Sequence, residues 1–240
     1  MTFTFSSPVT ADQLRKLPTR DVALLLLQSL NGSNGYLQYG GTMSSAREAF
    51  QAERDQNALV DRLSDAWCWL EAHALLSRVP SQSEAFRQLS RDGRELAADP
   101  KGIARFEART RLAGPLHPDL EKAVRTNFDL GDYETACFAA MKAVEVAVRN
   151  ASGLDNSLVG VALMRRAFQP HQKGQGGPLA DAGAEGGEQE AESALFAGAM
   201  GRYKNPSSHR TVDFDDPIEA AEIIQFADLL LRQVDRAKSR

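Results

Sequence analysis

The most regular pattern in the chain is the segment DDPIEAAEIIQFADLLLRQVDRAK, residues 215–238. Asp216 offers a side chain for the N-cap of a helix, and Pro217 suits the first helical turn. Apolar residues recur at the three- and four-residue spacing that places side chains on one face of a helix: Ile223, Ala227, Leu230 and Val234. Neighbouring apolar residues widen this face, so we expect a helix that is central to the fold or shared with a second subunit.

The region before this helix predicts several more helices. In residues 118–154 the turn DLGD separates a short helix from a long, alanine-rich one, and small residues let another helix approach closely. Glu145 and Arg149 are four residues apart and are expected to pair on the helix surface. Shorter helices follow at 157–170 and 188–203, so residues 112–240 are predicted to form an antiparallel helical bundle.

A glycine-rich segment, HQKGQGGPLADAGAEGG at residues 171–187, separates two of these helices. Its composition offers little to bury, so we expect a mobile loop outside the core. It differs from a Walker phosphate-binding loop, because no Gly-Lys-Ser/Thr follows and no strand precedes it.

Residues 1–111 show more mixed patterning. We expect a helix at 18–30 capped by Thr19, a helical stretch at 44–80, an extended piece near 85–90, and a turn at Gly93 before another brief helix. This order resembles a winged-helix module, which predicts either DNA binding or docking and dimerisation. Three arginines would lie near the wing, although acidic residues stand among them: Arg87, Arg91 and Arg94.

Composition narrows the functional classes. The chain has 240 residues with a formal net charge of −4, which disfavours nucleic-acid binding over the whole surface. The longest apolar run is too short to span a bilayer, and residues 1–10 lack the pattern of a signal peptide. Cys68 and Cys137 both lie in helical patterns and are expected to be buried, reduced thiols. These features predict a cytoplasmic location.

The segment RYKNPSSHR, residues 202–210, lies between two predicted helices. Asn205-Pro206 should end the preceding helix, which leaves Lys204, Asn205 and His209 on irregular backbone, where functional groups concentrate. The simpler interpretation is a polar connector whose Asn and Ser side chains cap helix ends. The remaining histidines fit structural or solvent-exposed roles better: His73, His117 and His171. No cluster has the spacing of metal ligands.

Several blocks, in order, resemble the Ymh-type family of HEPN-related proteins: LHPDLEKAV, DLGDYETACFAAMKAVEVAVRNASGL, GVALMRRAF, GEQEAESALFAGAMGRYKNPSSHR and EAAEIIQFADLLLRQVD. The resemblance covers roughly residues 115–236. It implies an all-helical, HEPN-like bundle, dimerisation, and the metal-independent endoribonuclease activity of toxin, CRISPR-associated and phage-defence proteins, with RNA as the substrate and no cofactor. The winged-helix-like N-terminal module is similar to one that often accompanies such domains.

The family signature is an arginine, four to six residues, and a histidine, often with a polar residue directly after the arginine. His209 matches the histidine and Asn205 the polar residue, while Lys204 stands at the arginine position. With the longer spacing, Arg202 can serve instead. Ser208 and Arg210 are expected to contact the RNA, and no metal is implied. Lysine lacks the bidentate fork of arginine, so a non-catalytic, dimeric DNA- or protein-binding regulatory module stays open as the alternative.

Overall fold

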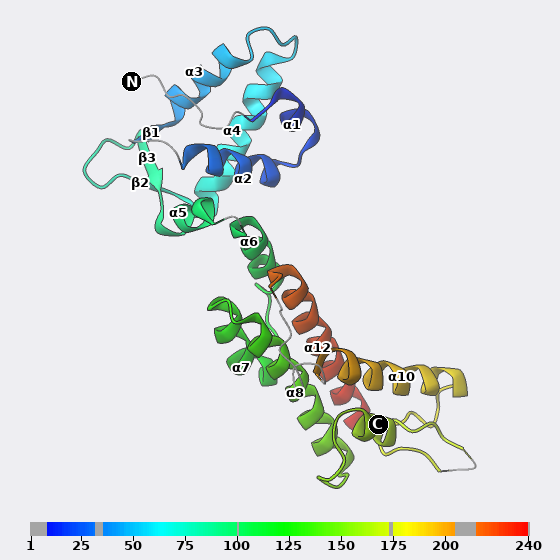
Figure 1. Ribbon diagram of the computed structural model, residues 1–240. Helices are drawn as coiled ribbons and strands as arrows, with labels where there is room; N and C mark the ends of the chain where they lie inside the picture. The colour runs from blue at the N-terminus through cyan, green and yellow to red at the C-terminus, as the bar shows by residue number, and fades with distance from the viewer. Residues whose placement is uncertain (1–8, 32–35, 100, 173–174, 205–214, 240) are drawn as a thin grey trace. The chain divides into compact units, whose positions relative to one another are not determined.

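The computed structural model describes residues 9–31, 36–99, 101–172, 175–204 and 215–239. The chain is mainly helical with one small sheet (Figure 1). It divides into two compact units, residues 1–106 and 107–240, which we describe one at a time. The boundary that the sequence predicts, between residues 111 and 112, stays a prediction.

The first unit combines helices with a three-stranded antiparallel sheet. The strand order is β1-β3-β2, with Leu37 opposite Arg87 and Leu76 opposite Leu89. Trp67 is buried in its core, where α2 packs against α4. The elements are α1 (Ala11–Lys16), α2 (Thr19–Leu30), β1 (Leu37–Gln38), α3 (Tyr39–Ala49), α4 (Gln56–Ala72), β2 (Leu76–Arg78), β3 (Phe86–Leu89) and α5 (Arg91–Ala98).

The N-terminal helices differ from the prediction. Thr10 forms a capping box with Gln13 and starts α1, which the sequence analysis missed. Thr19 is the first residue of α2 and not its cap, because Pro18 occupies the N-cap position.

The predicted continuous helix at 44–80 is wrong, since α3 ends at Ala49 and α4 begins at Gln56. Arg15 lies 2.6 Å from carboxylate oxygens of both Glu53 and Asp55, so the turn between the two helices is tied to α1. This contact comes from a residue about forty positions away, and local periodicity does not reveal it.

Gly93 lies within α5 and not in a turn. A Cβ atom at this position would come within 2.2 Å of the carbonyl oxygen of Leu75, so the glycine permits a close approach of the helix to the strand side. Ser90 caps α5 by accepting a hydrogen bond from the Gly93 amide.

The second unit is a helical bundle with α8 in contact with α7, α9 and α12. Gly131, at φ 81°, forms the predicted turn between α7 and α8. Small residues of α8 are fully buried, which confirms the predicted close packing: Ala136, Cys137 and Ala140. The elements are α7 (Pro118–Asp129), α8 (Tyr133–Ser152), α9 (Gly160–Ala167), α10 (Gly186–Ala199), the π-helical turn η1 (Met200–Lys204) and α12 (Pro217–Lys238), while α6 (Gly102–Arg111) passes from one unit into the other.

Helix α12 follows the sequence prediction closely. Asp216 caps it by accepting a hydrogen bond from the Ile218 amide, with Pro217 in the first turn. The four residues of the predicted face are buried: Ile223, Ala227, Leu230 and Val234. Leu229, on the opposite side, keeps 47% of its surface exposed within this unit.

The glycine-rich segment contributes to the core more than its composition suggests. Leu179 is buried and donates its amide to the carbonyl of Ala167, while Gly177 approaches the end of α9 too closely for a side chain. The prediction that this segment lies outside the core is therefore wrong for Leu179, because backbone hydrogen bonds hold it against α9.

The two cysteines differ. Cys137 is buried against α12, and its burial raises the pKa of the thiol to about 12. Cys68 is exposed, which corrects the expectation that both are buried, because it lies on the outward side of α4 next to the buried Trp67. Among the described residues, no helix is both long and apolar enough to cross a membrane.

Candidate functional site

Helix α10 ends in one turn of π-helix, η1, which leads directly into the segment with Asn205 and His209. A π-helical turn carries an extra residue relative to an α-helix and is frequent at functional sites. The turn contacts α8, α9 and α10, and the ring of Tyr203 meets that of Phe226 on α12 edge-on, with 6.2 Å between centroids. Two predicted site residues, Arg202 and Lys204, therefore lie on a turn anchored to several helices.

Lys204 is held by a buried carboxylate. Its Nζ lies 2.6 Å from Oε2 of Glu145, and Arg149 Nη2 donates to the other oxygen, Oε1, at 2.9 Å. Arg149 also donates to the carbonyl oxygen of Leu158 at 3.0 Å, which fixes its guanidinium. The three charged side chains, from α8 and η1, are mostly buried together and carry one net positive charge.

The charge on Glu145 is set by two opposing effects. Burial by itself raises the pKa of this carboxyl, but the contacts with Lys204 and Arg149 outweigh it and hold the pKa below its ordinary value. Glu145 is therefore ionised at neutral pH, and its charge compensates part of the positive charge of Lys204. Perturbed acids of this kind are enriched at functional sites, although buried ion-pair networks show them as well.

Glu145 is only 5% exposed, which corrects its predicted place on the helix surface. It is buried because η1 packs over this side of α8. The sequence does carry a signal that could have identified it, since a single acid stands within the apolar and small residues of AVEVAV. A charged residue within such a run is buried when the helix packs, and it then needs a partner of opposite charge.

Arg202 differs from Lys204 in its surroundings. Its side chain is exposed, and its guanidinium carbon lies 5.8 Å from the centre of the Tyr203 ring. Within the described part of the chain, no carboxylate pairs with it. Arg202 is therefore the cation of this turn that can accept an anion without first leaving an ion pair.

The other predicted site residues lie outside the described residues, and their arrangement stays a prediction: Asn205, Ser208, His209 and Arg210. The remaining histidines occupy structural positions. His73 stacks on Trp69, His117 Nε2 lies 2.9 Å from Asp235 Oδ2, and His171 donates its amide to Gln189.

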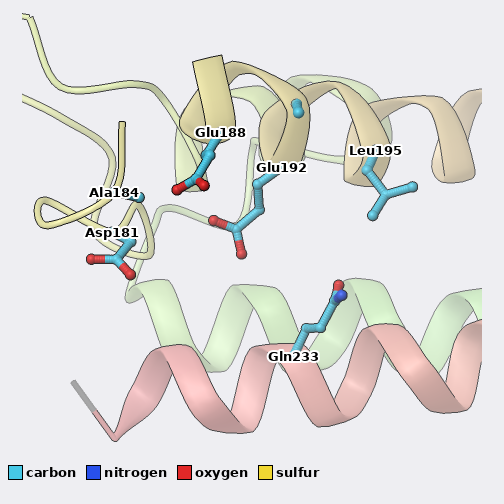
Figure 2. A pocket seen from close by; sticks show the side chains of 7 residues that line it. Asp181, Ala184, Glu188, Glu192, Leu195 and Gln233 are labelled. Carbon is cyan, nitrogen blue, oxygen red and sulfur yellow. The ribbon is translucent and has the colours of Figure 1, made fainter. Parts of the chain in front are cut away.

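A surface pocket of about 470 Å³ lies between α10 and α12 (Figure 2). Figure 2 shows Glu192 reaching from α10 toward α12, from which Gln233 points back, with Glu188 and Asp181 nearby. Carboxylates repel a phosphate, and the buried Oε1 of Gln233 is another acceptor. This pocket therefore suits a phosphate group poorly.

Metal ligands were not predicted, and the described ranges contain no group of three or more His, Cys, Asp or Glu side chains that could hold a metal ion.

Comparison with known proteins places the second unit in a family. No curated protein and no solved structure matches the chain. The family described as "Protein of unknown function (Hypoth_ymh)" matches residues 114–234, which is 121 of the 240 residues and includes α7 through most of α12. Because this match spans half of the sequence and contains the Glu145–Lys204 cluster, the chain belongs to the Hypoth_Ymh family.

Proposed function

We propose that this protein is a metal-independent endoribonuclease of the HEPN type that acts as a toxin or phage-defence effector. One observation carries the proposal. The anchored turn η1 presents an exposed cation, Arg202, near a partly buried one, Lys204, and this turn comes directly before the segment with Asn205 and His209 in the sequence. An anion-binding group next to a titratable histidine suits cleavage of a phosphodiester.

The surroundings of the two cations suggest different roles. Arg202 neutralises the phosphate in the transition state, since its guanidinium is exposed. Lys204 acts as a positioning residue, because Glu145 fixes the end of the turn through it.

The residues outside the described ranges complete the reaction. His209 takes the proton from the 2′-OH as a base or gives a proton to the leaving 5′-oxygen as an acid, and Asn205 orients the phosphate. The 2′-oxygen attacks the neighbouring phosphorus as the bond to the 5′-oxygen breaks. The products end in a 2′,3′-cyclic phosphate and a 5′-hydroxyl. Ser208 and Arg210 contact the RNA beside this point.

The finer architecture belongs to the same proposal. We assign the second unit to the HEPN-like bundles. We assign the first unit to the winged-helix-like modules because β1 precedes α3 and α4, the β2–β3 hairpin follows them, and the strand order is β1-β3-β2. We also propose a cytoplasmic homodimer. The exposed Leu229 on α12 and Leu195 on α10 supply apolar surface for it, and two copies of His209 would then provide both acid and base.

The alternative is a non-catalytic, dimeric regulatory module. The ion pair of Lys204 favours it, because a cation already compensated by Glu145 contributes less to a transition state. In that case the protein binds DNA or a protein partner and does not cleave RNA.

The decisive test is incubation of the purified protein with total RNA in the presence of a chelator. We expect the wild type to cleave RNA and to leave DNA intact, because DNA lacks the 2′-OH. His209→Ala abolishes cleavage, whereas the matched control His73→Ala, on an exposed histidine of the first unit, keeps it. Equal RNA integrity with wild type and His209→Ala, under every activation condition tried, would overturn the nuclease assignment in favour of the regulatory module.

A further inference from the structure

The outward face of α4 is acidic. Asp61, Asp65 and Cys68 are exposed at the spacing of one helix face, and neither aspartate pairs with a described cation. Arg62, the basic residue of this helix, is turned away, because its guanidinium donates to the carbonyl oxygens of Leu14 and Arg15 at the end of α1. In a winged-helix arrangement this helix would face DNA, and its charge repels phosphate.

The arginines around the β2–β3 hairpin do not reverse this charge. Residues 56–98 hold five arginines and six carboxylates. Arg87, the least exposed of the hairpin arginines that pair with acids, contacts Glu71 at 2.5 Å, while Arg94 donates to the carbonyl oxygen of Leu89. Exposed pairs such as Arg78 with Glu84 break at little cost, so pairing does not prevent these arginines from contacting DNA. The local net charge of −1 is what disfavours DNA binding by this segment.

At Cys68 the acidic face adjoins a pocket of about 440 Å³. Tyr39 and Trp67 line it together with the charged side chains of Glu71, Glu84 and Arg87, and Arg87 is paired with Glu71. Tyr39 is 43% exposed but fixed, because its hydroxyl group is hydrogen-bonded to Ser64 Oγ at 2.8 Å and its ring meets Trp67 edge-on. A Cβ atom at Gly40 would contact nothing within 4 Å, so this side of the pocket is open. A rigid, exposed aromatic side chain in a pocket is typical of protein-binding sites.

We propose that this surface of the first unit binds a protein segment in which an apolar side chain lies next to lysine or arginine. The apolar side chain enters the pocket against the exposed ring of Tyr39, which packs on the buried Trp67, and the cation lies against Asp65 and Asp61 on the adjoining turns of α4. Charge complementarity selects this occupant over duplex DNA, whose phosphates meet the same aspartates. The assignment is independent of the ribonuclease activity, since it uses residues of the first unit alone.

The test uses the full-length protein and a displayed library of short random peptides. Selection on the wild type should enrich peptides with Lys or Arg beside Leu, Met or Phe. Asp65→Lys should lower the affinity for the selected peptides about tenfold, because it reverses one charge. Tyr39→Ala should lower this affinity by a similar factor, because it removes the exposed aromatic ring. Asp92→Lys, on an exposed acid of α5 outside this surface, is the matched control and should leave binding unchanged.

Since Asp65 is an exposed surface residue, the Asp65→Lys variant is expected to fold even where Tyr39→Ala does not, and circular dichroism checks both. A library without enrichment, or peptides that bind Asp65→Lys as well as wild type, would refute the proposal. If a mixed-sequence DNA duplex displaces the peptides at physiological salt, this unit is instead a nucleic-acid-binding module.

Discussion

Replacing Glu145 by glutamine tests the buried cluster directly. The change keeps the shape of the side chain but removes the negative charge between Lys204 and Arg149. Breaking a buried ion pair by removing one partner costs about 3–5 kcal/mol, because the remaining charge stays desolvated. Lys204 and Arg149 keep 16% and 19% of their side-chain surface exposed, so water relieves part of this penalty and we expect a loss of roughly 2–3 kcal/mol.

Thermal unfolding followed by circular dichroism at neutral pH measures this loss. For a unit of this size, the expected destabilisation lowers Tm by roughly 6–12 °C. Glu121→Gln is the matched control, because Glu121 also pairs with an arginine four residues later, Arg125, but on the exposed surface of α7. Its Tm should stay nearly unchanged. If both variants lose the same stability, the compensated charge in the core is not what holds the η1 turn against α8.

Further predictions concern pH, the thiols and the two cations. The pKa of Glu145 is lowered in the folded protein, so the ionised carboxylate stabilises the fold fully at pH values above 4.5, the ordinary pKa of a glutamate. This stabilisation is lost as pH falls below 4.5. The difference in unfolding free energy between wild type and Glu145→Gln, measured by urea unfolding, should therefore shrink at acidic pH. A thiol reagent such as DTNB at mildly alkaline pH should label Cys68 in the native protein and Cys137 only after unfolding, because the pKa of Cys137 is about 12, and equal native labelling would contradict its burial. In the RNA-cleavage assay, Arg202→Ala should lower the rate about 100-fold if Arg202 neutralises the phosphate. Lys204→Arg should leave that rate unchanged under this assignment, whereas a clear increase would transfer the role to position 204.

The helices of the second unit could be predicted because their signals are local. The cap at Asp216, the apolar period of α12 and the turn at Gly131 each involve neighbouring residues, and all three appear in the structure. The break between α3 and α4 could not be found in this way. Arg15, which contacts Glu53 and Asp55 in the turn between these helices, is distant in sequence and reaches them only after the chain folds.

The candidate site, too, could be predicted where its signals are local and not where they depend on packing. The segment from Arg202 to His209 is recognisable from residue types and spacing, and its first cation lies exposed on η1. The role of Glu145 was missed, because a charge at four-residue spacing from Arg149 fits a surface pair equally well. Only the packing of η1 over α8 decides that this carboxylate is buried and shared with Lys204.

The π-helical turn has a consequence for comparing sequences within the family. In an α-helix each residue advances the chain by about 100° around the axis, since one turn takes 3.6 residues. A residue added to an α-helix would rotate all that follows by this angle, but a π-helical turn takes up the extra residue locally. Removing one residue from Met200–Lys204 would therefore restore α-helical geometry and remove the bulge. A one-residue gap at this place in an alignment of Hypoth_Ymh proteins would mark the loss of the π-helical turn that carries Arg202 and Lys204, and not merely a shorter helix.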